Sequence, residues 1–114
     1  MVVFNPGDII HLNFDPAAGQ EMKGAHFALV LSIRSFNQSG LVVACPITQG
    51  AQSNARTAGF AVSLMACGTE TQGIVLCHQT KTLDWRARGA SRRESVPDDV
   101  LQDVLDRYRS ILPE

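Results

Sequence analysis

Three histidines, His11, His26 and His78, are the side chains of this sequence that can exchange protons near neutral pH. Histidine titrates at about pH 6.5, so one imidazole can be neutral while a neighbouring one is charged. Two imidazoles in one site would therefore provide the base and the acid that a proton-transfer reaction needs. The alternative for each is an ordinary surface or hydrogen-bonded residue, and His11, on the polar face of an alternating run, fits that alternative.

A second chemical feature is the positive charge between residues 79 and 93. Five basic residues oppose the single Asp84, a net charge of +4, and they are Lys81, Arg86, Arg88, Arg92 and Arg93. Such a stretch can neutralise phosphates, and binding through it should weaken steeply with salt. Trp85 can stack on a base, but a buried Trp85 is the favoured interpretation. Because the whole chain carries a net charge of −1, nucleic-acid contact requires a local patch.

The cysteines and the chain ends narrow the class of protein. Cys45, Cys67 and Cys77 are odd in number and lack paired spacing, which argues against a disulfide framework. No CxxC pair or His/Cys cluster has zinc-ligand spacing, so we expect neither metal nor cofactor. The N-terminus lacks signal-peptide features, and no apolar run approaches the roughly 20 residues of a membrane span. We expect a cytoplasmic protein with no membrane partner.

The elements that must position these residues are mainly strands. The chain has 114 residues, of which 45% are apolar, enough for a single domain spanning residues 1–114. Alternating or β-branched apolar runs predict strands at residues 10–14, 28–33, 41–47, 60–64 and 73–79. Residues 15–24 and 48–59 form two long polar loops. Loops of this length often carry function.

One long helix is predicted at the C-terminal end. Its apolar residues recur on one face, and they are Val100, Leu101, Val104, Leu105, Tyr108, Ile111 and Leu112. Ser95 is expected as the N-cap, with Pro97 and two aspartates in the first turn. The helix is expected to pack in the core or a dimer interface and to carry no chemistry. Short strands closed by one helix indicate a small β-barrel with a packing helix.

An ordered series of motifs, from about Gly7 to Leu112, resembles the PemK/MazF family of small bacterial toxins. The motifs are Gly7-Asp8-Ile9, Phe14-Asp15-Pro16, Gly19-Gln20-Glu21, residues 28–32, residues 46–50, the PemK (Kid)-like residues 55–64, residues 79–84 and residues 86–89. The resemblance implies a mainly β fold with a C-terminal α-helix, the SH3-like small β-barrel of PemK, MazF and CcdB. Such proteins are usually homodimers.

The resemblance also implies an activity. Family members are toxins of type II toxin–antitoxin systems that inhibit translation and growth by cutting single-stranded mRNA at short motifs. They need no metal, and they leave a cyclic phosphate and a 5′-hydroxyl. A cognate antitoxin, expected to have an acidic, disordered C-terminus, covers the RNA site.

The resemblance further implies roles for individual residues. Glu21 matches an active-site position and would act as a base or a positioning acceptor. Thr48 matches a threonine whose hydroxyl can bond a phosphate oxygen. The expected RNA-binding residues are Gln49, Arg56, Gln79, Lys81, Arg86 and Arg88.

At other catalytic positions the sequence departs from the family. His26 stands where most relatives carry an arginine, and Leu76 and His78 stand where PemK-type members carry an arginine and an acid. Our hypothesis is that His26 and His78 jointly replace the family arginine and aspartate. The expected catalytic residues are then these two histidines, Glu21 and Thr48.

Two alternatives remain open. The first is a catalytically weak or inactive member that binds its antitoxin as a regulatory module. The second is a CcdB-like inhibitor of DNA gyrase, although the loop motifs follow the ribonuclease branch. An RNA-cleavage assay without metal separates the enzyme from the inactive module.

Overall fold

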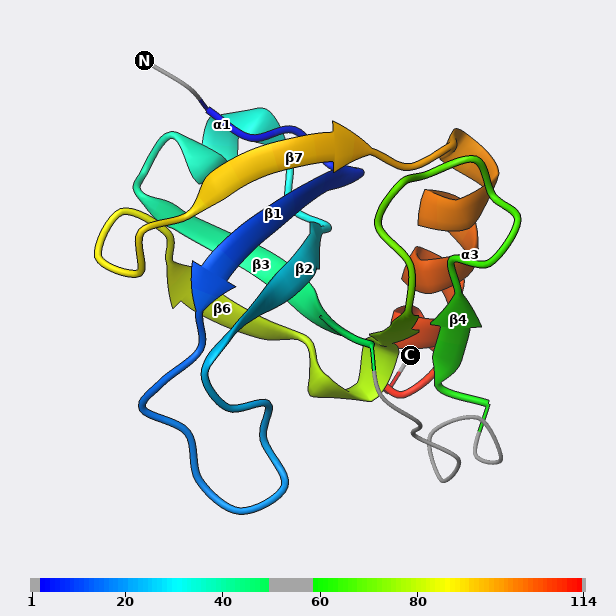
Figure 1. The fold of residues 1–114 in the computed structure, drawn as a ribbon, viewed down its shortest axis with the longest axis horizontal. Coiled ribbons are helices and arrows are strands. Elements are labelled where there is room, and N and C mark those ends of the chain that lie inside the picture. Colours follow the sequence, from blue (N-terminus) through cyan, green and yellow to red (C-terminus); the bar gives the residue numbers. More distant parts are fainter. Residues whose placement is uncertain (1–2, 50–58, 114) are drawn as a thin grey trace.

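The computed structural model describes residues 3–49 and 59–113, which form a curved antiparallel sheet flanked by a long helix (Figure 1). Within these residues the sheet has seven strands in the order β4-β5-β3-β2-β1-β7, and β6 pairs with β3 outside this path. The strands are β1 (Asp8–Asn13), β2 (Ala25–Val30), β3 (Leu41–Thr48), β4 (Ala61–Ser63), β5 (Ile74–Leu76), β6 (Lys81–Asp84) and β7 (Ser91–Ser95). The helices are α1 (Arg34–Asn37), the 3-10 turn η1 (Cys77–Gln79) and α3 (Asp98–Arg109).

The central strands β2 and β3 are buried on both faces at residues 28–30 and 44–47, which explains the apolar runs there. Leu29 of β2 pairs with Ile9 of β1 and with Cys45 of β3, and all three belong to a cluster beneath α3. The preceding residue of β2, Ala28, points to the opposite face, because side chains alternate along a strand.

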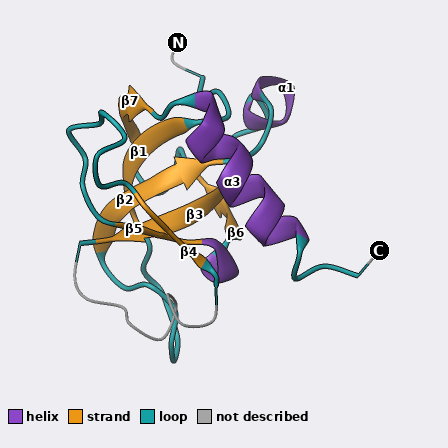
Figure 2. Ribbon diagram, turned by 90° about the vertical axis from the view of Figure 1, so that its right-hand side faces the viewer, coloured by secondary structure: helices purple, strands orange, loops and turns teal. Residues whose placement is uncertain are grey.

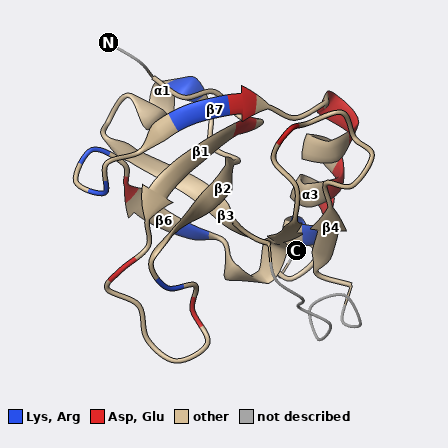
Figure 3. Ribbon diagram, in the orientation of Figure 1, with Lys and Arg blue, Asp and Glu red and all other residues tan. Residues whose placement is uncertain are grey.

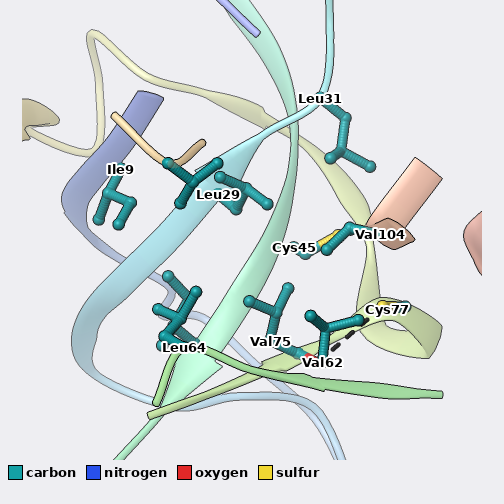
Figure 4. Close-up of a cluster of buried hydrophobic side chains, with 11 residues drawn as sticks. Ile9, Leu29, Leu31, Cys45, Val62, Leu64, Val75, Cys77 and Val104 are labelled. Atoms are coloured by element: carbon teal, nitrogen blue, oxygen red, sulfur yellow. Dashed lines mark hydrogen bonds between the residues drawn. The ribbon is translucent and has the colours of Figure 1, made fainter. Parts of the chain in front are cut away.

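The helix α3 closes the first of these faces (Figure 2). Val104 is fully buried from the helix side, and Figure 4 shows it beside Cys45 and close to Val62 and Val75. The opposite face holds a second cluster, which includes Phe4, Phe14 and Trp85. The indole N–H of Trp85 donates to the carbonyl of Asn37 at 2.9 Å. The interpretation of Trp85 as a core residue is therefore confirmed.

Several predicted boundaries are wrong, and two of the errors affect the site. The strand expected at residues 28–33 instead begins at Ala25, so His26 lies inside β2. It ends early because the Ser32 hydroxyl bonds the side chain of Asn37 in α1. The strand expected at residues 73–79 ends at Leu76, and the chain then turns through η1, which places His78 in a turn.

The strands β6 and β7 were not predicted. The burial of β7 shows why: it is an edge strand whose side chains are mostly exposed, so its residues lack apolar alternation. The expected N-cap Ser95 is also wrong, because Ser95 ends β7 and donates to Asp8 at 3.3 Å. Pro97 occupies the N-cap position of α3 instead. Within the described ranges, no helix has the length and apolar character needed to cross a bilayer.

Candidate functional site

A cleft of about 310 Å³ opens between the loop of residues 14–24 and the chain that runs through η1 into β6. It is lined by Gln20, Glu21, Met22, Pro46, His78, Gln79, Thr80 and Lys81. Four of these residues, Glu21, His78, Gln79 and Lys81, were predicted as site residues. The other four were not predicted as site residues. Gln20 and Pro46 lie within motifs of the family resemblance, whereas Met22 and Thr80 carry no signal in the sequence.

The turn η1 exposes His78 at the cleft. Leu76, the last residue of β5, is buried with Ile74 against Met22 and Ala61. The position where the family resemblance implies an arginine is therefore filled by an apolar side chain in this protein. Two residues further on, the His78 ring lies 5.6 Å from the ring of Phe60, centroid to centroid. The imidazole thus stands at the solvent edge of the cleft.

The charged groups of the cleft are only loosely paired. One carboxylate oxygen of Glu21 accepts the backbone N–H of Ala18 at 2.8 Å. The other lies 3.9 Å from the ammonium nitrogen of Lys81, and the two side chains are 51% and 29% exposed. An ion pair this open to solvent contributes about 0–1 kcal/mol. Both groups can therefore exchange this contact for one with a ligand.

The loop that carries Glu21 is closed at its base by hydrogen bonds. Phe14 N donates to Gly24 O at 2.8 Å, and Gly24 N donates to the Asp15 carboxylate at 3.0 Å. The guanidinium of Arg88 donates to the carbonyls of Asn13 and Asp15, at 3.1 and 2.8 Å. Figure 1 shows this loop projecting beyond the lower end of the sheet.

The predicted catalytic residues His26 and Thr48 do not line the cleft. The pairing of β2 with β3 ends at Phe27 and Ile47, so His26 and Thr48 lie at adjoining strand ends. By the alternation of side chains, both share the face of Pro46, which does line the cleft. His26 is half-buried, and Thr48 is buried.

A glycine fixes the chain beside Thr48. A Cβ atom on Gly73 would lie 2.5 Å from the carbonyl oxygen of Thr48, and the φ angle of Gly73 is +137°. Only glycine combines that backbone conformation with so close an approach. The strand β5 can therefore begin directly beside the end of β3.

The remaining predicted RNA contacts are spread over the molecule. Gln49 lines a second hollow, with Phe27 and Arg93, on the other face of the sheet. Arg86 lies over the Trp85 ring at 4.9 Å, Arg88 holds the loop base as described, and Arg56 lies outside the described residues.

The basic stretch is likewise dispersed over β6, the following turn and β7 (Figure 3). Arg92 is bonded to Asp8 at 3.1 Å, and Arg93 lies over the Phe27 ring. Of the basic side chains in residues 81–93, Lys81 is the one that lines the cleft. The stretch therefore does not form a single groove at this site.

Within residues 3–49 and 59–113, no group of three or more His, Cys, Asp or Glu side chains is placed to hold a metal ion. The thiols of Cys45 and Cys77 lie in the buried cluster under α3. Burial raises the pKa of Cys45 to about 12 and that of Cys77 to about 11. The cleft thus offers a carboxylate, an imidazole and an ammonium group, a set that can move protons and bind an anion.

Comparison with known proteins agrees with this fold. Residues 5–112 match the family of PemK-like, MazF-like toxins of type II toxin-antitoxin systems. The chain is 43% identical over 107 residues to the endoribonuclease PemK of Escherichia coli, covering 93% of this chain and 80% of PemK. MazF of Deinococcus radiodurans superimposes with a TM-score of 0.88 at 38% identity, covering 97% of each chain. A MazE–MazF structure from the same organism gives a TM-score of 0.81 at 38% identity, covering 97% of this chain and 96% of that one.

These matches confirm three predictions from the sequence: the family, a mainly β fold with a C-terminal helix, and an endoribonuclease class. The chain therefore belongs to the PemK-like, MazF-like toxins of type II toxin-antitoxin systems.

Proposed function

We propose that this toxin cuts single-stranded mRNA without a metal ion, using the RNA's own 2′-hydroxyl as the nucleophile. The observation that carries the proposal is the meeting of Glu21, His78 and Lys81 in one open cleft. A carboxylate and an imidazole can take and give protons at the two ends of the reaction, and an ammonium group can stabilise the added charge.

The reaction balances with the groups present. A base removes the 2′-hydroxyl proton, and the 2′-oxygen forms a bond to the neighbouring phosphorus. The bond from phosphorus to the 5′-oxygen breaks, and an acid donates a proton to that oxygen. The products are a 2′,3′-cyclic phosphate and a 5′-hydroxyl. DNA lacks the 2′-hydroxyl and is spared.

Glu21 and His78 are proposed to exchange the two protons, because both face the cleft. Lys81 is proposed to bind the phosphate and oppose the negative charge of the phosphorane. His26 and Thr48 are proposed to contact the same phosphate from the adjoining strand ends, with His26 taking the place of the family arginine.

A cognate antitoxin is the proposed protein partner. The MazE–MazF structure supports this, because it shows a relative's toxin together with MazE. An acidic antitoxin tail laid over the cleft would compete with RNA for Lys81. Homodimer formation remains a prediction from the family resemblance, and a cytoplasmic location remains a prediction from the sequence.

Single variants test the assignment of the cleft. We expect Glu21→Gln and His78→Gln each to lower the RNA cleavage rate by roughly 10²–10⁴-fold, the usual contribution of a general acid or base. The wild type should show a bell-shaped pH–rate profile, and each variant should lose one limb of it. His11→Gln is the matched control, because the His11 ring packs on Phe27 away from the cleft.

Two outcomes would contradict this assignment. If His78→Gln cleaves RNA at the wild-type rate, His78 has no part in proton transfer. If the wild type cuts no RNA but binds its antitoxin, the chain is an inactive regulatory member. The apolar burial of Leu76 in place of the family arginine is the observation that favours that second candidate.

A further inference from the structure

The side chain of Gln79 is engaged inside the protein. Its oxygen accepts the backbone N–H of Met22 at 3.0 Å, across 57 residues of sequence. Gln79 follows His78 in the turn η1, and Met22 follows Glu21 in the loop. One hydrogen bond therefore joins the two chain segments that carry the proposed acid and base.

An apolar contact reinforces the same junction. The Met22 side chain packs against Ile74 and Leu76 of β5, and it also reaches the cluster that contains Phe14. The backbone of Met22 is thus held by Gln79 while its side chain is held by the sheet. Glu21, one residue earlier, is left half-exposed over the cleft.

Within residues 3–49 and 59–113, two polar contacts join residues 16–23 to other parts of the chain. They are the Met22–Gln79 hydrogen bond and the loose Glu21–Lys81 ion pair. The other hydrogen bonds of the loop lie within it or at its base. Without Gln79, the position of the Glu21 carboxylate would depend mainly on the Met22 side chain.

We propose that Gln79 is a positioning residue, which orders the loop so that Glu21 faces His78 and Lys81, rather than a residue that reads RNA. The proposal rests on the proposed cleavage function for its kinetic consequence. Its structural consequence, protection of the Met22 amide, is independent of that function. Because small displacements of a catalytic group are costly, loss of the contact should lower the rate constant for cleavage and leave RNA affinity nearly unchanged.

Two variants separate the acceptor oxygen from the bulk of the side chain. Gln79→Met keeps the length of the side chain and removes the acceptor. Gln79→Glu keeps an acceptor oxygen at the same number of bonds from the backbone and removes the N–H donors of the amide. Gln102→Met, on the exposed face of α3, is the matched control.

Hydrogen exchange of the Met22 amide reports the contact directly. We expect Gln79→Met to lose the protection of this amide and Gln79→Glu to retain it, as the control does. Unchanged protection in Gln79→Met would overturn the proposal, whether or not the protein cleaves RNA.

Kinetics then test the positioning role. We expect Gln79→Met to lower the single-turnover rate at saturating RNA by roughly 10–100-fold. Its Kd for an RNA carrying 2′-deoxyribose at the cut site should change less than about 3-fold. Gln79→Glu should recover most of the rate, with weaker RNA binding because of its added negative charge. A Gln79→Met variant that binds this RNA poorly but cleaves at the wild-type rate when saturated would show that Gln79 contacts RNA directly.

Discussion

The carboxylate of Glu21 and the ammonium of Lys81 illustrate how single residues serve a site that must accept a polyanion. Their separation of 3.9 Å and their exposure keep the pair weak. A phosphate entering the cleft can therefore take over Lys81 at little cost. The same exchange would release Glu21 from its ion pair with Lys81, as the proposed role of Glu21 in proton transfer requires.

The three thiols give a prediction at the same scale. Because burial raises the pKa values of Cys45 and Cys77 to about 12 and about 11, both remain protonated in the folded protein at mildly alkaline pH. Only the thiolate is alkylated, so iodoacetamide at about pH 8 should modify half-buried Cys67 at least roughly 10-fold faster than the other two. Mass spectrometry of timed samples measures the rates. Equal rates for Cys45 and Cys67 in the native protein would contradict this, and equal rates in urea serve as the control.

Only some of the residues that line the cleft could be predicted from the sequence. Glu21 and His78 were predicted as site residues, and the structure brings them to one cleft. The internal bond of Gln79 was not foreseeable, because its partner Met22 lies 57 residues away and offers only a backbone N–H. His26 and Thr48 lie on the face of the sheet that Pro46 shares with the cleft, because side chains alternate along a strand, but neither residue lines the cleft.

At the level of elements, β7 is joined to the loop before β5 through one carboxylate. Glu94 accepts the hydroxyl and the N–H of Thr71, both at 2.7 Å, and the N–H of Glu70 at 3.1 Å. The Thr71 hydroxyl is the main cause that lowers the pKa of Glu94, and the two backbone N–H groups add to it. This loop leads through Gly73 to β5 and so to the turn that carries His78.

We expect Glu94→Gln to lower the free energy of unfolding by about 1–2 kcal/mol at neutral pH, because an amide replaces a charged acceptor. A lowered pKa in the folded state gives stability that is present above the unfolded-state pKa and is lost as the pH falls through the folded value. The difference between variant and wild type should therefore shrink below about pH 4. Urea unfolding at several pH values measures it. A difference that stays constant from neutral to acid pH would exclude an ionised Glu94 as the cause.

Elements with a clear apolar pattern were predictable, and exposed ones were not. The helix α3 was predicted from seven apolar residues, and five of them pack against the sheet. The other two, Ile111 and Leu112, lie beyond the end of α3 and are exposed, so that part of the prediction is wrong. The edge strand β7 was not predicted, because its pairing with β1 depends on backbone hydrogen bonds, which do not require particular side chains. The turn η1 was not predicted, because its first residue, Cys77, is as buried as β5 and therefore continues the apolar run of that strand.

In the whole molecule, the sheet has a buried cluster on each face, and the cleft lies away from the cluster that packs against α3. The cluster under α3 fixes β2, β3 and β5 relative to the helix (Figure 4). The cleft lies on the other face, where a loop and a turn meet beyond the strand ends. Side chains at the cleft, such as His78, can therefore change without disturbing the cluster under α3.

The chemistry of the RNA ends tests the central claim most directly. The purified toxin is incubated with a long single-stranded RNA in excess EDTA, and a matched RNA carries 2′-deoxyribose at the mapped cut site. The account predicts cleavage in EDTA with a 2′,3′-cyclic phosphate upstream and a 5′-hydroxyl downstream, and no cleavage of the deoxy substrate. Products with 5′-phosphate ends, or cleavage that stops when EDTA is added, would contradict it.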